Sequence, residues 1–210
     1  MNEAWHRKVN EDKWDRWARV ADGKGLKFRF LRKCQVHAIK IADPRPGISF
    51  LDIGCGTGWA VGFAAKISDY NGIFYGIDMS EEMIKKAMVN FKEHGNIRFL
   101  RASSESIPIE NNFFDTIICT NSFHHYLKPD LAMAEIARLL KPGGKVFILD
   151  LAADSLVIKI IDKLMKLLEP SHVKLYSSKE FGDMMAAAGL KYLGYNSPAK
   201  LFRVQMGRNE

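Results

Sequence analysis

Residues 50–60, FLDIGCGTGWA, join an apolar run to three glycines on alternate positions. The run begins at Ile48, after the loop DPRPG, and reaches Ile53. A short apolar run bounded by glycine and proline is typical of a buried strand in a parallel sheet. Glycines after such a strand permit a tight turn and let the backbone come close to a ligand. The stretch therefore predicts a central strand that ends in a ligand-binding loop.

Strand-like and helix-like segments alternate after this loop. Parallel strands need long crossovers, and helices usually supply them. The pattern predicts an α/β, Rossmann-like fold whose mostly parallel seven-stranded sheet carries helices on both faces and an antiparallel terminal strand. The expected strands are residues 48–53, 72–78, 97–102, 115–121, 145–151, 191–196 and 200–206, and the expected helices are residues 59–67, 81–95, 131–140 and 178–190.

The chain is interpreted as one domain in four parts, because 210 residues suit a single core. Residues 1–46 form a helical preface, 47–151 the ligand-binding core, 152–177 a helical insertion, and 178–210 a terminal helix and hairpin. In the preface, Leu31, Cys34, Ala38 and Ile41 recur on one helical face, and Gly23 and Gly25 offer a hinge. The preface is therefore a candidate lid.

Residues 155–168 are predicted to be an amphipathic helix. Three interpretations stay open: a roof over an apolar cavity, plain packing, or a dimer contact, so the protein is expected to be a monomer or a homodimer. The expected apolar face comprises Leu156, Val157, Ile160, Ile161, Leu164, Met165 and Leu168, and it lies opposite Lys159, Asp162, Lys163 and Lys166.

Composition indicates an ordinary soluble domain. Hydrophobic residues make up 47% of the chain, and no apolar run is long enough to span a bilayer. The polar, aromatic first residues lack the features of a secretory signal, so a cytoplasmic location is expected. The net charge of +7 suits a polyanion, but basic and acidic residues are interleaved, which argues against a nucleic-acid partner. The three cysteines are far apart and indicate neither disulfides nor a metal site.

The glycine spacing discriminates between nucleotide ligands. A dinucleotide loop needs GxGxxG, but Trp59 stands where the last glycine belongs, and its indole is expected to obstruct packing beside a pyrophosphate. The Walker sequence is absent as well. Asp78 ends the second strand about twenty residues after the loop and has the reach to bind both hydroxyls of a ribose. A nucleoside without a pyrophosphate fits these features best.

Four motifs follow one another within residues 50–189: LDIGCGTG, GIDMSEEMIKKA, ESIPIENNFFDTIICTNSFHHY and LKPGGKVFILD. Together they resemble the motifs of the class I S-adenosylmethionine-dependent methyltransferases, in the small-molecule branch that includes enzymes of quinone biosynthesis. The resemblance implies that S-adenosylmethionine is the cofactor, with S-adenosylhomocysteine as product. No metal is implied.

The resemblance also implies a cofactor site. Asp52 orients the ammonium group, Asp78 holds the ribose, and Met79 packs against adenine. The Asp that usually contacts the adenine amine is replaced by Ser103, so that Ser104 and Glu105 are expected to share its role. Asn121 approaches the methionine end through its backbone carbonyl. The loop residues implied to border the cofactor are Gly54, Cys55, Gly56 and Gly58. No chemical role is assigned to Cys55, whose side chain could equally belong to the hydrophobic core.

His124 and His125 follow the fourth strand and are the candidate catalytic bases, because histidine changes charge near neutral pH. His124 is expected to face the pocket, with His125 packed behind it. The alternative that both histidines only orient the loop by hydrogen bonding stays equally open. Tyr126 and His172 are weaker candidates, and Trp5, Trp14 and Trp17 could close over the ligand.

The function predicted first is transfer of a methyl group to an O or C atom of a small, partly apolar acceptor. The alternatives are methylation of RNA or another nucleic acid, and a non-catalytic protein that binds S-adenosylmethionine. Against the nucleic-acid alternative, the fourth strand is followed by NSFHHY rather than by an NPPY-like motif.

Overall fold

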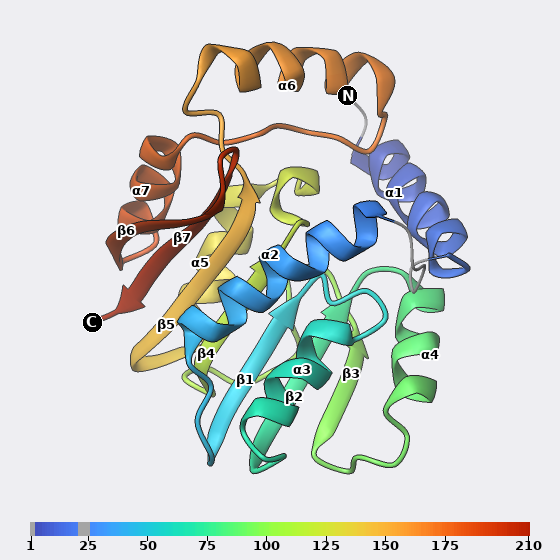
Figure 1. Cartoon of the computed structure of the whole chain (residues 1–210), viewed down its shortest axis with the longest axis vertical. Coiled ribbons are helices and arrows are strands. Elements are labelled where there is room, and N and C mark those ends of the chain that lie inside the picture. Colours follow the sequence, from blue (N-terminus) through green and yellow to red (C-terminus); the bar gives the residue numbers. More distant parts are fainter. Residues whose placement is uncertain (1–2, 21–25) are drawn as a thin grey trace.

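The computed structural model describes residues 3–20 and 26–210, and its seven strands form one twisted sheet between two layers of helices (Figure 1). The hinge predicted at Gly23 and Gly25 lies outside the described residues. In chain order the elements are α1 Glu3–Ala18, α2 Leu26–Ala42, β1 Ile48–Ile53, α3 Trp59–Ile67, β2 Gly72–Asp78, α4 Glu81–Asn90, β3 Ile97–Arg101, β4 Phe114–Thr120, the 3-10 turn η1 Phe123–His125, α5 Pro129–Leu139, β5 Leu140–Leu151, α6 Leu156–Leu168, α7 Ser178–Ala187, β6 Leu190–Ala199 and β7 Phe202–Asn209.

The strand order is β3-β2-β1-β4-β5-β7-β6. The pairs from β3 through to β5 are parallel, whereas β7 runs antiparallel to both β5 and β6. The predicted α/β fold with one antiparallel terminal strand is therefore confirmed. The chain leaves β1 toward β2 on one side and reaches β4 on the other, so the order reverses between β1 and β4. In open sheets of this kind, ligands bind beyond the carboxyl ends of the strands at such a reversal.

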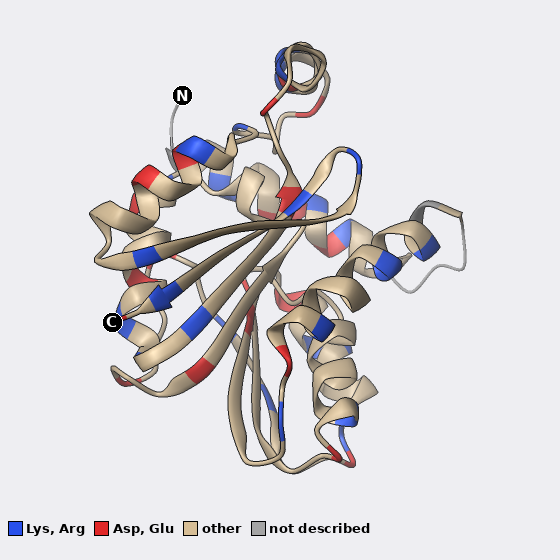
Figure 2. Ribbon diagram, turned by 60° about the vertical axis from the view of Figure 1, so that its left-hand side comes forward, with Lys and Arg blue, Asp and Glu red and all other residues tan. Residues whose placement is uncertain are grey.

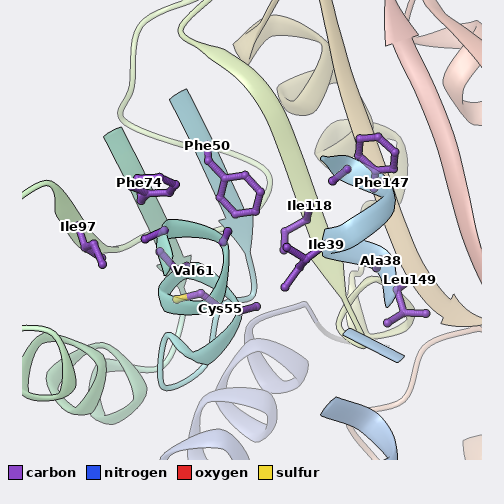
Figure 3. Packing of buried hydrophobic residues seen from close by; sticks show 14 of the residues in the cluster. Ala38, Ile39, Phe50, Cys55, Val61, Phe74, Ile97, Ile118, Phe147 and Leu149 are labelled. Atoms are coloured by element: carbon purple, nitrogen blue, oxygen red, sulfur yellow. The ribbon is translucent and has the colours of Figure 1, made fainter. Parts of the chain in front are cut away.

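Both faces of the sheet are buried. Helices α2, α3 and α4 cover one face, where Phe50, Phe74 and Ile118 pack against Ile39 and Val61 (Figure 3). Helices α5 and α7 cover the other face, with a second cluster. Burial on both faces explains why the central strands read as continuous apolar runs. The second cluster includes Leu51, Ile53, Ile117, Met133, Ile136, Phe181 and Met185.

Several element ends differ from expectation. Helix α4 stops at Asn90 instead of near Gly95, because the chain turns there and Phe91 packs across Gly62 and Phe99. Strand β5 begins at Leu140, before the predicted Lys145, since Leu140 already pairs with β4. The buried face of α2 passes through Cys34, Ala38, Ile39 and Ala42, while Leu31 and Ile41 are only half-buried.

Helix α6 turns most of its apolar face outward, which disagrees with two of the three interpretations left open, a roof over the cavity and plain packing. It stands beyond the carboxyl ends of the strands, apart from the sheet (Figure 1). Asp162, predicted to be on the polar outer face, is buried, and most of the predicted apolar face is open to solvent. The reason is local: the loop after α6 supplies hydrogen-bond donors that turn Asp162 inward. The exposed apolar side chains are Leu156, Val157, Ile160, Leu164, Leu167 and Leu168.

Basic and acidic residues are interspersed over the helices and strands, as Figure 2 shows. Many form short surface pairs, such as Lys85 with Glu81 and Lys179 with Asp183. None of the helices in the described part of the chain has the length and apolar content that crossing a membrane demands.

Candidate functional site

A pocket opens beyond the carboxyl ends of β1, β2 and β4, at the reversal of strand order. It holds about 870 Å³ of space, counting the part open to solvent. Helix α1 lies over it. The lining residues are His6, Arg7, Asn10, Trp14, Ile53, Gly54, Gly56, Ile77, Asp78, Met79, Met83, Ala102, Ser103, Ser104, Glu105, Asn121, Ser122, His125, Tyr126 and Leu127.

The glycine loop forms one wall of this pocket. Gly54 and Gly56 line it with φ angles of 78° and 52°, in the left-handed region that favours glycine. A Cβ on Gly56 would meet only the Met83 sulfur, at 3.9 Å, so this backbone faces open space. Gly58 does not line the pocket. A Cβ there would lie 2.6 Å from the ring of Phe99, which shows that this glycine serves helix–sheet packing.

Cys55 is also outside the lining, contrary to its place among the expected cofactor neighbours. Its side chain is buried in the core with Phe99, and its amide donates to the Ile77 carbonyl (Figure 3). Burial, with the Asp78 and Asp52 carboxylates nearby, raises the pKa of the Cys55 thiol well above its usual value. Neither the side chain nor the amide is therefore available to a ligand.

Two carboxyl groups from adjacent strands stand behind the loop. Asp78 lines the pocket, and its oxygens accept hydrogen bonds from the amides of Gly56 and Ser80, each at 2.9 Å. These bonds fix the carboxylate while leaving lone pairs for a ligand. Burial nevertheless raises the pKa of Asp78.

Asp52 lies deeper and does not line the pocket. It is 1% exposed, and its Oδ1 has no hydrogen-bond partner. Burial, and secondarily the charge of Asp78, raise its pKa to about 8. A cation placed near these two carboxyls would favour their ionised forms, whereas an anionic pyrophosphate would be repelled. Trp59 does not bear on the choice of ligand as expected, since its indole stacks on Phe63 outside the pocket.

Most of the other predicted contacts lie at the pocket. Met79, Ser103 and Ser104 line it beyond β2 and β3. Glu105 also lines it, but its carboxylate is 2.5 Å from the Arg7 guanidinium of α1. Asn121 turns the chain after β4 with a φ of 57°, a conformation that asparagine tolerates.

The two histidines are arranged in the reverse of the expected order. His125 lines the pocket, and His124 packs behind it, with 3.9 Å between the ring centroids. The reason is the buried Asp150 at the end of β5, whose carboxylate accepts from the His124 amide at 3.1 Å and lies 2.8 Å from its Nδ1. Asp150 thus holds His124 inward, and the 3-10 turn then directs the next side chain into the pocket.

His125 is held in one tautomer. Its Nδ1 lies 2.7 Å from the Ser171 carbonyl oxygen, which can only accept, so Nδ1 carries the proton and Nε2 keeps its lone pair. Burial, followed by the charge of His124, lowers the pKa of His125 well below its usual value. The ring of Trp14 packs edge-on against it, with 5.0 Å between centroids. His125 is therefore a neutral, oriented imidazole at pH 7.

The weaker candidates also divide into residues that line the pocket and residues that lie outside it. Tyr126 lines the pocket, and its hydroxyl lies 3.2 Å from the Ser122 hydroxyl. Burial raises the pKa of Tyr126 well above its usual value, so it remains a neutral phenol. His172 lies outside the lining, 2.8 Å from Asp162, and supports α6. Trp5 is half-exposed, and Trp17 packs on Trp14.

Helix α1 brings two residues that the sequence did not single out, His6 and Asn10, beside the predicted Trp14. His6, Asn10 and Trp14 are spaced by four and face the pocket together. His6 and Asn10 are 1% and 3% exposed, yet both His6 nitrogens and the Asn10 Oδ1 have no partner. Buried polar groups without partners are costly, and the opening beside them is where a ligand would satisfy them. The sequence feature that could have revealed this face of α1 is the four-residue spacing of polar side chains, since no apolar stripe marks it.

Polar contacts fasten α1 on both sides of the pocket. Arg7 pairs with Glu105, and Glu11 with Arg101. On the other side, Lys13 bonds to Ser171 at 2.6 Å and lies 2.9 Å from Glu169. Each of these partly exposed ion pairs contributes little to the attachment of α1. Among the described residues, no group of three acidic, histidine or cysteine side chains is placed to hold a metal ion.

Sequence comparison relates the central part of the chain to known proteins. Residues 51–148 match the family model of the methyltransferase domain. An uncharacterized methyltransferase YcgJ of Bacillus subtilis is 34% identical over 158 residues, which are 73% of this chain and 61% of that protein. A ubiquinone/menaquinone biosynthesis C-methyltransferase UbiE of Shewanella frigidimarina is 28% identical over 128 residues, 60% of this chain and 51% of that protein. The chain thus spans about half to three fifths of these relatives' length.

Solved structures share the fold. The crystal structure of YcgJ from Bacillus subtilis superposes with a TM-score of 0.71 at 23% identity and covers 84% of this chain and 98% of that one. The magnesium protoporphyrin IX methyltransferase ChlM from Synechocystis, with bound S-adenosylhomocysteine, gives a TM-score of 0.73 at 18% identity over the whole of both chains. At these identities the likeness concerns the fold.

Proposed function

We propose that this chain, which belongs to the class I S-adenosylmethionine-dependent methyltransferases, transfers a methyl group to an O or C atom of a small, partly apolar acceptor. The observation that carries the proposal is the meeting, at one pocket, of an open glycine backbone, the Asp78 carboxyl with the buried Asp52 behind it, and a neutral oriented imidazole. The first two suit a cationic nucleoside, and the third suits removal of a proton from an acceptor.

The residues present fit the cofactor. Its ammonium and sulfonium groups are cations, and Asp52 offers an unpartnered buried carboxyl oxygen on that side. Asp78 would hold the ribose, and Met79 would pack against adenine beside Ser103 and Ser104. Bound S-adenosylmethionine supplies an activated methyl on a good leaving group, so the protein mainly has to position the acceptor and exclude water.

The acceptor would lie under α1. His6 and Asn10 offer polar atoms without partners, while Trp14, Tyr126 and Leu127 give the same region an aromatic and apolar wall. Such a mixture suits a small molecule with an apolar body and one or two polar groups. Helix α1 would act as a lid, since its attachment on both sides is polar. On this basis the chain would divide into a lid, a core, an insertion, and a terminal helix with a hairpin.

His125 would be the general base. Its Nδ1–H is tied to Ser171, so a proton taken from the acceptor goes to Nε2. Because burial keeps the ring neutral, the base form is populated throughout the physiological range. His124 would position His125 through its own pairing with Asp150 rather than touch the acceptor. Positioned general bases contribute typically about 10²- to 10⁴-fold.

The test is transfer of a labelled methyl group from S-adenosylmethionine to a metabolite extract, with mass spectrometry of whatever acquires the label. Asp78→Asn is expected to weaken cofactor binding by at least about tenfold in calorimetry, since a charged acceptor of hydrogen bonds is lost. His125→Gln is expected to reduce turnover by about 10²-fold or more while leaving cofactor affinity nearly unchanged.

His94→Gln is the matched control, because His94 stacks on Tyr70, away from the pocket lining. It should leave both measurements at the wild-type level. Absence of cofactor binding in the wild-type protein would refute the proposal as a whole. Unchanged turnover in His125→Gln would remove the base but leave the methyl transfer standing.

A further inference from the structure

Helix α6 exposes an apolar surface that packing does not explain. Its outer side carries six aliphatic residues that are 55% to 83% exposed: Leu156, Val157, Ile160, Leu164, Leu167 and Leu168. Contiguous exposed apolar patches on a soluble domain generally mark a binding surface. In the part of the chain that the structure describes, no other helix concentrates exposed aliphatic side chains in this way.

The inner side of α6 is firmly attached, so the exposed side is a defined face of a folded helix. Ser155 caps its first turn by accepting from the Ile158 amide. Ile158 packs with Ala153 and Leu175 in a small separate cluster. The buried Asp162 accepts from the Leu175 amide at 2.7 Å and lies 2.8 Å from His172.

Lysines border the exposed apolar face along one side only. Lys159, Lys163 and Lys166 fall between the inner face and the apolar face when residues are placed about 100° apart around the helix. Figure 2 views α6 nearly along its axis, with basic residues gathered on one side. Lys166 also pairs with Asp162 at 3.0 Å. A helix that combines a wide aliphatic face with bordering lysines is typical of segments that lie in a lipid–water interface.

The segment after α6 connects this surface to the candidate catalytic histidines. The amides of Val173 and Lys174 donate to the His124 carbonyl, and the Ser171 carbonyl accepts from His125. Lys13 of the α1 lid reaches the Ser171 hydroxyl. Whatever covers α6 therefore lies on the side of the molecule where the pocket is roofed.

We propose that α6 docks the protein reversibly on an anionic bilayer surface, with its aliphatic face among the acyl chains and its lysines at the phosphate groups. The proposal rests on the proposed function only where it names the acceptor: an apolar molecule dissolved in that bilayer. Such an acceptor would pass from the lipid to the pocket without crossing water, and methylation would be faster on a membrane than in solution.

Charge favours a bilayer over a second copy of the chain as the occupant. An antiparallel twofold dimer through α6 would bring the lysine border of one copy close to that of the other, and any such dimer would join two proteins that each carry a net charge of +7. Anionic headgroups instead attract every one of these lysines, by roughly a fivefold gain in binding per lysine near the surface.

The experiment measures sedimentation of the full chain with vesicles of phosphatidylcholine, with and without phosphatidylglycerol. Ile160→Ser/Leu164→Ser changes two exposed side chains, so the fold should be retained, and it is expected to lower the partition coefficient at least about tenfold. Lys159→Gln/Lys163→Gln should lower it selectively on anionic vesicles, and added salt should do the same for the wild type. Val89→Ser/Leu131→Ser removes exposed aliphatic residues from α4 and α5 and is the matched control.

Binding to anionic vesicles that is lost in the α6 variants and kept in the control supports the proposal. Two results overturn it: wild-type protein that stays in solution with anionic vesicles, or a dimer in sedimentation velocity that the Ile160→Ser/Leu164→Ser change dissociates. Calorimetry of S-adenosylmethionine on the same variants should give wild-type affinity. A protein that binds vesicles but not this cofactor would instead refute the proposed function alone.

Discussion

Asp52→Asn tests the electrostatics of the pocket through the pH dependence of stability. Burial and the nearby Asp78 raise the pKa of Asp52 to about 8, from an ordinary value of 3.8. Between these values the folded protein binds one proton more than the unfolded chain, so ionisation after unfolding favours the unfolded state. The contribution of Asp52 to the free energy of unfolding therefore falls as pH rises, by about 1.4 kcal/mol per pH unit. From pH 5 to pH 7 this amounts to about 2.7 kcal/mol.

The measurement is urea unfolding of both proteins at pH 5, 6 and 7. Asparagine cannot titrate, so Asp52→Asn should gain about 2.7 kcal/mol relative to wild type between the lowest and the highest pH. Other shifted groups, such as Asp78 and Asp162, remain in both proteins and largely cancel in this difference. Asp12→Asn, at an exposed position of α1, controls for the loss of one negative charge. A stability difference that does not change with pH would refute the reasoning.

Three further outcomes are expected. Gly54→Ala should lower the free energy of unfolding by about 1–3 kcal/mol, because φ is 78° and the new Cβ would lie 2.5 Å from the Ser122 hydroxyl oxygen; Gly47→Ala, at φ 87° in open space, isolates the backbone part. Asn10→Leu should raise the KM for the acceptor with little change in cofactor Kd, and an unchanged KM would contradict the placing of the acceptor under α1. Binding of S-adenosylmethionine at pH 7 should release a proton as Asp52 ionises, seen by calorimetry in buffers of different ionisation enthalpy, and Asp52→Asn should abolish that release.

The sheet and one wall of the pocket could be predicted because local sequence determines them. A run such as Ile48–Ile53, buried along almost its entire length, has few alternatives to a central parallel strand. The backbone just after this strand has positive φ at Gly54 and Gly56, and glycine is the residue that adopts such a conformation most readily. Asp78 follows from the same topology, since parallel strands end at the same edge. These features need no knowledge of distant residues.

The histidine pair could not be ordered from sequence because the deciding partner lies 26 residues away. His124 and His125 are adjacent and chemically identical, and only Asp150 at the end of β5 shows which one is held inward. The α1 residues were missed for a related reason. His6 and Asn10 lie on a helix that is polar on all sides, so no apolar stripe marks the face that covers the pocket.

Helix α6 shows how one buried polar contact changes the meaning of an amphipathic pattern. The periodicity of residues 155–168 predicts which side chains share a face, but it assumes that the apolar face is turned toward the protein. Here Asp162 receives hydrogen bonds from the loop after the helix, and a buried carboxylate with partners fixes the rotation of the helix. The side that packs is then defined by Ile158 and Asp162 together, and the aliphatic side is left facing outward. Burying that side requires something outside the chain, and the bordering lysines select an anionic surface for the role.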